Sequence, residues 1–195
     1  ARRVYGAPLA LPERRRPGRI RLGYLGADLR NHVMGKMIWQ AVRHHDRSRF
    51  ALHFYSLSRE RDEWTERFAG IADRFEVIAD LPEREAAACI AADDLDLLVD
   101  LSTHTKGAKP GILALKPARV QITHVGTAGS VGLSAVDFKL TDRFADVPQT
   151  HMSGWYDPYV PTAIGNYQAM KARKRSAMRL IMGPWKDNAE RAQPG

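Results

Sequence analysis

Asp28 and His32 stand four positions apart in the segment ADLRNHVMG, and together they could form a general base. A carboxylate that orients an imidazole is a common arrangement for proton transfer. If the turn that holds them winds into the following helix, the two residues share one helix face. The structural alternative is that Asp28 or Asn31 caps this helix and His32 is a residue of its first turn.

A second candidate site, formed by His104, Thr105 and Lys106, follows the apolar run LLVDL. An imidazole, a hydroxyl and an ammonium group at the end of a strand could bind phosphate or sugar hydroxyls. The alternative is a polar turn that leads into a helix at Pro110.

A glycine-rich loop follows the next apolar run, VQITH, and contains Gly126, Thr127, Gly129 and Ser130. Such a loop could bring backbone N–H groups close to a ligand. Its glycines are spaced three apart, so it is neither a GxGxxG fingerprint nor a Walker loop. An ordinary loop is the alternative.

The elements that must position these residues alternate between strand and helix. We expect strands over residues 19–25, 50–57, 74–78, 97–101, 120–124 and 136–140, and helices over 33–45, 62–72, 81–92 and 110–115. This alternation predicts an α/β fold, with a Rossmann-like parallel sheet covered by helices on both faces. Each candidate segment follows a strand, which is where such sheets build their sites.

The net charge of +8 is concentrated in Arg14–Arg16 and Lys171–Arg175. A net positive charge can indicate nucleic acid or an anionic membrane surface as a partner. No zinc-finger spacing, aromatic RNA-binding signature or helix-turn-helix accompanies it, so nucleic acid is not expected. Solvated basic ends beside an anionic small-molecule site are the simpler interpretation, and a non-catalytic basic binding module is an alternative function.

The single cysteine, Cys89, excludes an intramolecular disulfide and suits a buried position in a cytoplasmic protein. No apolar run approaches the roughly 18 residues that span a bilayer, and the N-terminus lacks the apolar core of a signal peptide. No grouping of His, Cys, Asp and Glu has metal-ligand spacing, so no metal is expected. We interpret His44 and His45, at a helix end, and His53, in a strand, as structural.

Residues 18–148 resemble the catalytic region of the O-GlcNAc transferase family, including its bacterial and SPINDLY-type members. The matching motifs are IRLGYLGADLRNHVMGKM, FALHFYSLS and DLDLLVDLSTHTKGAKPGILALKPARVQITHVGTAGSVGLSAVDFKLTD. The resemblance implies one lobe of a GT-B glycosyltransferase, an inverting and metal-independent enzyme with no cofactor. Such enzymes move N-acetylglucosamine from UDP-GlcNAc to Ser or Thr of acceptor proteins, whereas SPINDLY-type relatives use GDP-fucose.

The resemblance also implies roles for the candidate residues. The first histidine of the family motif falls on His32, which we carry over as a catalytic or acceptor-side residue with Asp28 beside it. Residues 104–106 and 126–129 would line the same cleft.

Residues 149–195 resemble a different family, the cocaine-esterase-like, X-Pro dipeptidyl-peptidase-type α/β hydrolases, through HMSGWYDPY and RLIMGPW. The resemblance makes Asp157 the triad acid, but Asp187 stands where the triad histidine belongs, and no GxSxG serine elbow is present. A serine hydrolase is therefore the alternative enzyme, and it would lack both nucleophile and base.

We accordingly expect a basic, Pro-rich arm over residues 1–18, a Rossmann-like lobe over 19–148 and a foreign or poorly ordered tail over 149–195. The nucleotide-binding second lobe of the family is not expected in this chain, so the chain alone would show little or no transferase activity.

Overall fold

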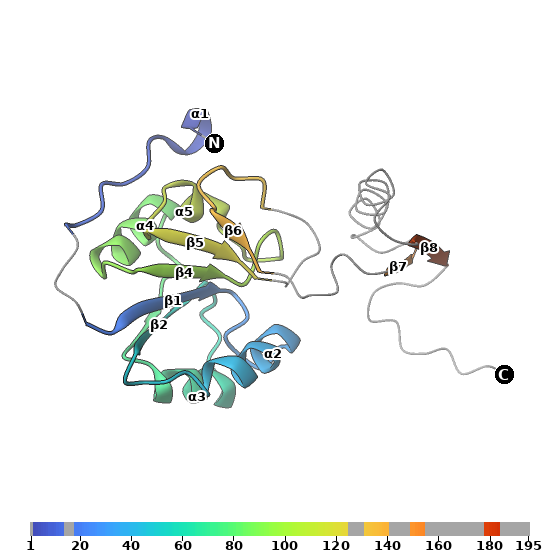
Figure 1. Ribbon diagram of the computed structural model, residues 1–195, viewed down its shortest axis with the longest axis horizontal. Helices are drawn as coiled ribbons and strands as arrows, with labels where there is room; N and C mark the ends of the chain where they lie inside the picture. Colours follow the sequence, from blue (N-terminus) through green and yellow to red (C-terminus); the bar gives the residue numbers. More distant parts are fainter. Residues whose placement is uncertain (1, 14–17, 125–130, 141–148, 155–177, 184–195) are drawn as a thin grey trace. The chain divides into compact units, whose positions relative to one another are not determined.

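The computed structural model describes residues 2–13, 18–124, 131–140, 149–154 and 178–183 (Figure 1). The chain forms two units, Ala1–Leu140 and Thr141–Gly195. In the second unit, β7 (Gln149–Gly154) pairs in parallel with β8 (Met178–Gly183). The hydrolase-like residues 155–157 and 184–187 lie outside the described residues, so the hydrolase likeness stays a prediction. The predicted boundary near residue 148 lies at the end of the undescribed segment 141–148 and also stays a prediction.

A six-stranded, fully parallel sheet forms the first unit. Its strand order, β3-β2-β1-β4-β5-β6, is that of the Rossmann fold and confirms the predicted sheet. The strands are β1 (Ile20–Gly26), β2 (Phe50–Ser56), β3 (Arg74–Val77), β4 (Leu97–Asp100), β5 (Val120–Thr123) and β6 (Phe138–Lys139).

Helices cover both faces of this sheet because alternate side chains along each strand point to opposite faces. Phe54 of β2 packs in a core with residues of α2 and α3, whereas the adjacent Tyr55 packs with α4 and α5. Figure 1 shows the two helix pairs on opposite sides of the strands. The described helices are α1 (Arg2–Tyr5), α2 (Val33–Val42), α3 (Glu63–Ile71), α4 (Glu83–Ala92) and α5 (Pro110–Ala114).

The N-terminal arm packs against the α4–α5 side of the first unit. The Leu9 N–H donates to the carbonyl of Leu115 at the end of α5 (2.8 Å), and Arg119 donates to the Pro12 carbonyl (2.9 Å). The arm thus satisfies a carbonyl that the helix end would otherwise leave without a partner.

The helix expected over residues 33–45 ends at Val42, and His45 turns back to the sheet. The Tyr24 hydroxyl lies 2.6 Å from His45 Nε2. Burial, helped by the charge of Arg47, lowers the pKa of His45 and favours a neutral imidazole, although a helix C-terminus by itself would favour the imidazolium.

This lowered pKa predicts a loss of stability on mild acidification. Below the ordinary histidine pKa of about 6.5, His45 binds a proton in the unfolded chain but not in the folded one. The free energy of unfolding therefore decreases as the pH is lowered, until the pH passes the lower pKa of the folded state. We expect the urea midpoint to fall from pH 7.5 to 5.5, and to fall less in His45→Gln. Some of the fall should persist in the variant because burial also lowers the pKa of His53 and His124. Identical pH slopes in the two proteins would contradict the prediction.

Candidate functional site at the carboxyl ends of β1 and β4

The strand order changes direction between β1 and β4. From β1 the chain passes to β2 on one side, and after β3 it returns to β4 on the other side. Leu25 and Asp100 are paired across these strands, so the segments that follow them leave the same edge of the sheet. In open α/β sheets ligands bind at this kind of switch point.

The two segments that leave β1 and β4 are tied together. The Ala27 N–H donates to Ser102 Oγ (3.0 Å), and the Leu101 N–H donates to the Leu25 carbonyl (2.9 Å). Gly107 adopts φ +86°, and a Cβ there would lie 3.2 Å from Ala27 Cβ. Glycine at this position therefore permits both the left-handed turn and the close approach of the two segments.

Asp100 shapes the segment after β4. Its buried carboxylate accepts hydrogen bonds from the N–H groups of Ser102 (3.1 Å) and Thr103 (3.0 Å). Burial raises the pKa of Asp100, and these two hydrogen bonds oppose that rise. The Asp100 side chain thus organises the turn from within.

The predicted residues 104–106 form the outer part of this turn. His104 and Lys106 are exposed, whereas the Thr105 hydroxyl donates to the Ser102 carbonyl (2.8 Å). The structure therefore leaves an imidazole and an ammonium group available to a ligand and uses the hydroxyl within the turn.

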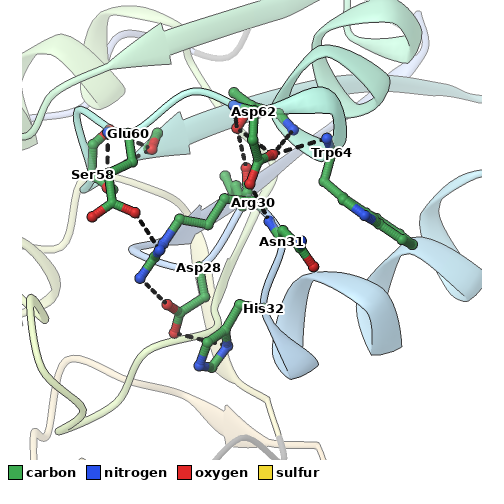
Figure 2. A network of polar contacts seen from close by, with 11 residues as sticks. Asp28, Arg30, Asn31, His32, Ser58, Glu60, Asp62 and Trp64 are labelled. Carbon is green, nitrogen blue, oxygen red and sulfur yellow. Dashed lines mark hydrogen bonds and ion pairs between the residues drawn. The ribbon is translucent and has the colours of Figure 1, made fainter.

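Asp28 and His32 meet, but not on a helix face. His32 Nδ1 lies 3.5 Å from Asp28 Oδ2 (Figure 2). His32 itself is the N-cap of α2, with extended backbone, and its Nδ1 accepts a hydrogen bond from the Met34 N–H (3.2 Å). The expectations of a cap at Asp28 or Asn31, and of a turn that winds into the helix, were wrong because regular helix begins only at Val33.

Arg30 adds a charge that the sequence analysis missed. Its Nη2 lies 3.7 Å from Asp28 Oδ1, and its Nη1 pairs with Glu60 in the segment between β2 and α3 (Figure 2). The Glu60 N–H in turn donates to Ser58 Oγ (3.1 Å). The signal available in the sequence was that both segments follow parallel neighbouring strands and so share one edge of the sheet.

Asp62 fastens these same two segments. As the N-cap of α3 it accepts from the N–H groups of Trp64 and Thr65, both at 2.9 Å, and it also accepts from the Asn31 N–H at 2.6 Å. Desolvation raises the pKa of Asp62, but these hydrogen bonds outweigh it and leave the pKa below its ordinary value. The Thr65 hydroxyl also donates to the Leu29 carbonyl (3.1 Å), so the N-terminus of α3 holds the segment that carries Asp28 and His32 at two points.

His124, at the end of β5, is a third imidazole at this edge that was not singled out from the sequence. Its backbone N–H donates to the Asp100 carbonyl (2.8 Å), and its buried ring Nδ1 has no hydrogen-bond partner among the residues that the structure describes. Burial lowers the pKa of His124, so its ring is favoured in the neutral form. The predicted binding residues Gly126, Thr127 and Gly129, with Ser130, lie outside the described residues and stay predictions.

Within the described ranges, no group of three or more His, Cys, Asp and Glu residues could hold a metal ion. In the same part of the chain, no helix is long and apolar enough to cross a membrane. The site offers a partly exposed imidazole beside a largely buried carboxylate, and an exposed imidazole and ammonium group on the segment after β4. Such an arrangement can accept a proton from a hydroxyl and bind an anionic or hydroxyl-rich ligand.

Relatives of known sequence match about two thirds of the chain. The chain is 31% identical over 140 residues to "Probable UDP-N-acetylglucosamine–peptide N-acetylglucosaminyltransferase SEC" of Arabidopsis thaliana, which covers 70% of this chain and 14% of that protein. It is 33% identical over 135 residues to the SPINDLY protein of the same plant, which bears the same enzyme name, with 67% and 15% covered. The chain thus spans about a seventh of the length of these relatives.

A solved structure and a family profile extend the comparison. A mutant of the O-GlcNAc transferase of Thermobaculum terrenum aligns with a TM-score of 0.65 over 91% of this chain and 41% of that one. At 22% identity, this likeness shows that the chain has the fold of a GT-B glycosyltransferase lobe. The sequence profile of glycosyl transferase family 41 matches residues 4–170, most of the chain. The chain therefore belongs to glycosyl transferase family 41.

Proposed function

We propose that this chain is the Rossmann-like N-terminal lobe of a protein O-glycosyltransferase, which moves N-acetylglucosamine from UDP-GlcNAc to Ser or Thr of an acceptor protein. Membership of family 41 and the names of the relatives support this proposal. The observation that carries it is the position of the Asp28–His32 pair at the switch point of the sheet.

In the proposed reaction, His32 accepts the proton of the acceptor hydroxyl while that oxygen attacks the anomeric carbon. The bond from this carbon to the diphosphate oxygen breaks, UDP leaves, and the configuration inverts. The side chain of His32 is 40% exposed and can meet an acceptor, whereas Asp28, at 12%, is placed to orient it from behind. The exposed His104 and Lys106 would bind sugar or phosphate oxygens.

The nucleotide sugar is the donor substrate in this proposal, and no resident metal or cofactor takes part. We place the reaction in the cytoplasm, which suits a chain whose single cysteine, Cys89, is half-buried with a pKa raised by burial.

A chimera tests the proposed function. The segment of the Thermobaculum terrenum enzyme that aligns with this chain would be replaced by this chain, and transfer from UDP-GlcNAc to an acceptor protein would be measured. We expect transfer by the chimera. A folded chimera that binds donor and acceptor but transfers no sugar would contradict the proposal.

The purified chain alone is expected to give no measurable transfer, because the relatives that bear the enzyme name are about seven times longer. The measurement is incorporation of labelled N-acetylglucosamine into an acceptor protein. Incorporation by this chain would show that the remainder of those proteins is dispensable. Labelling by a fluorophosphonate probe would instead support the alternative serine hydrolase, and salt-dependent retention on nucleic acid would support a basic binding module.

A further inference from the structure

His32 Nδ1 faces two groups that make opposite demands on it. It accepts a hydrogen bond from the Met34 N–H at 3.2 Å, and it lies 3.5 Å from the carboxylate of Asp28. One ring nitrogen cannot accept a hydrogen bond through its lone pair and also carry a proton toward a carboxylate. The neutral ring therefore has two competing forms at this position.

The two forms differ in what the ring offers to a substrate. When Nδ1 accepts from Met34, the proton is on Nε2, which is then a hydrogen-bond donor. When Nδ1–H donates to Asp28, Nε2 is free to accept a proton. Only the second form can serve as a general base through Nε2.

Arg30 acts on the group that favours the second form. One oxygen of Asp28 faces His32, and the other lies 3.7 Å from Arg30 Nη2. Arg30 does not turn fully to Asp28, because its Nη1 pairs with Glu60 in the segment after β2 (Figure 2). A single guanidinium thus lies between two carboxylates, one largely buried and one 70% exposed.

We propose that Arg30, anchored on Glu60, is a positioning residue that divides the Asp28 carboxylate between itself and His32 and thereby selects which nitrogen of His32 carries the proton. The catalytic meaning of this selection rests on the proposed function, but the selection itself does not.

Other charged groups described on the neighbouring segments have partners of their own or are exposed. Asp62 is occupied with the N–H groups of Asn31 and α3, and the segment after β4 contributes the exposed His104 and Lys106. Among the described ion pairs, His32 is joined only to Asp28. Arg30 is the other described ion-pair partner of Asp28, so it is placed to compete with His32 for this carboxylate.

The test is the ratio of the two neutral tautomers of His32 in the full chain. Two-bond ¹H–¹⁵N spectra of the histidine rings, recorded well above the titration range of histidine, report this ratio directly. The His32 signals are assigned by their loss in His32→Asn. We expect the Nε2–H form to dominate in the wild type and Arg30→Met to raise the Nδ1–H form, with a change in the ratio of up to roughly fivefold, as for a partly exposed ion pair.

Two further variants make the result specific. Adding Asp28→Asn to Arg30→Met should abolish the gain, because the effect passes through this carboxylate. Arg59→Met removes the same charge from the segment after β2, where Arg59 pairs with the exposed Asp80, and should leave the ratio unchanged.

An unchanged His32 ratio in a folded Arg30→Met protein would overturn the proposal. If that variant does not fold, Arg30→Gln, which keeps a polar reach to Glu60, takes its place with the same two outcomes. The measurement needs neither donor nor acceptor. A negative result would thus leave the proposed glycosyl transfer untouched, and an inactive chimera would leave the tautomer result standing.

Discussion

Replacement of His32 by Asn in the chimera is expected to lower kcat/KM for sugar transfer by roughly 10²–10⁴-fold, the usual contribution of a positioned general base. Asn is the informative substitution because it is among the best N-cap residues. Its side-chain oxygen can accept the Met34 N–H in place of Nδ1. The loss of rate would then report the loss of the imidazole rather than of the helix start.

Two companion variants separate chemistry from structure. His44→Asn changes an exposed histidine just beyond the end of α2 and should retain full transfer. His32→Ala removes both imidazole and cap, so it should also lower the free energy of unfolding by about 1 kcal/mol. Full transfer by His32→Asn would remove His32 from the mechanism.

Gly35→Ala is expected to lower the free energy of unfolding by about 1–3 kcal/mol, as overpacking does. Ala in place of Gly within a helix ordinarily stabilises by up to about 1 kcal/mol. Here a Cβ at Gly35 would lie 2.3 Å from the Arg30 carbonyl oxygen and 2.6 Å from that of Asp28. Both are backbone atoms of the segment that carries the candidate site, so they cannot yield without moving Asp28.

Gly70→Ala is the matched control. Gly70 lies in α3, and a Cβ there would meet nothing within 4 Å. This variant should be more stable than the wild type, by up to about 1 kcal/mol. Urea unfolding of the two variants should therefore give changes of opposite sign, and a Gly35→Ala protein at least as stable as the wild type would show that the segment can move at little cost.

Apart from the short α1, which lies in the expected arm and was not predicted, the strands and helices of the first unit followed closely from the sequence because each carries a local signal. Apolar runs such as LLVD became β4, and the helical spacing in EREAAACIAA became α4. The parallel sheet followed from their alternation. The least accurate boundary was the end of α2, where His45 leaves the helix to contact the buried Tyr24.

The candidate site was predicted only in part. The spacing of Asp28 and His32 predicted that these two side chains meet, and they do, although through an extended turn instead of a helix. Arg30 and Glu60 could not be paired from the sequence, because 30 positions separate them and charged residues in connecting segments are usually solvated. Likewise, the role of Ser102 as partner of Ala27 depends on a contact across 75 positions.

The central place of β1 in the sheet has a consequence for the order of assembly during synthesis. β1 can pair with β2 once residue 56 is available, but its other neighbour, β4, begins only at Leu97. Until then the nascent chain presents β1 as an open edge, the kind of surface that recruits other strands and invites aggregation. A ribosome-bound chain that ends before Ser102 would contain Asp28 and His32 but would lack the hydrogen bond from the Ala27 N–H to Ser102 Oγ, which joins the segments after β1 and β4.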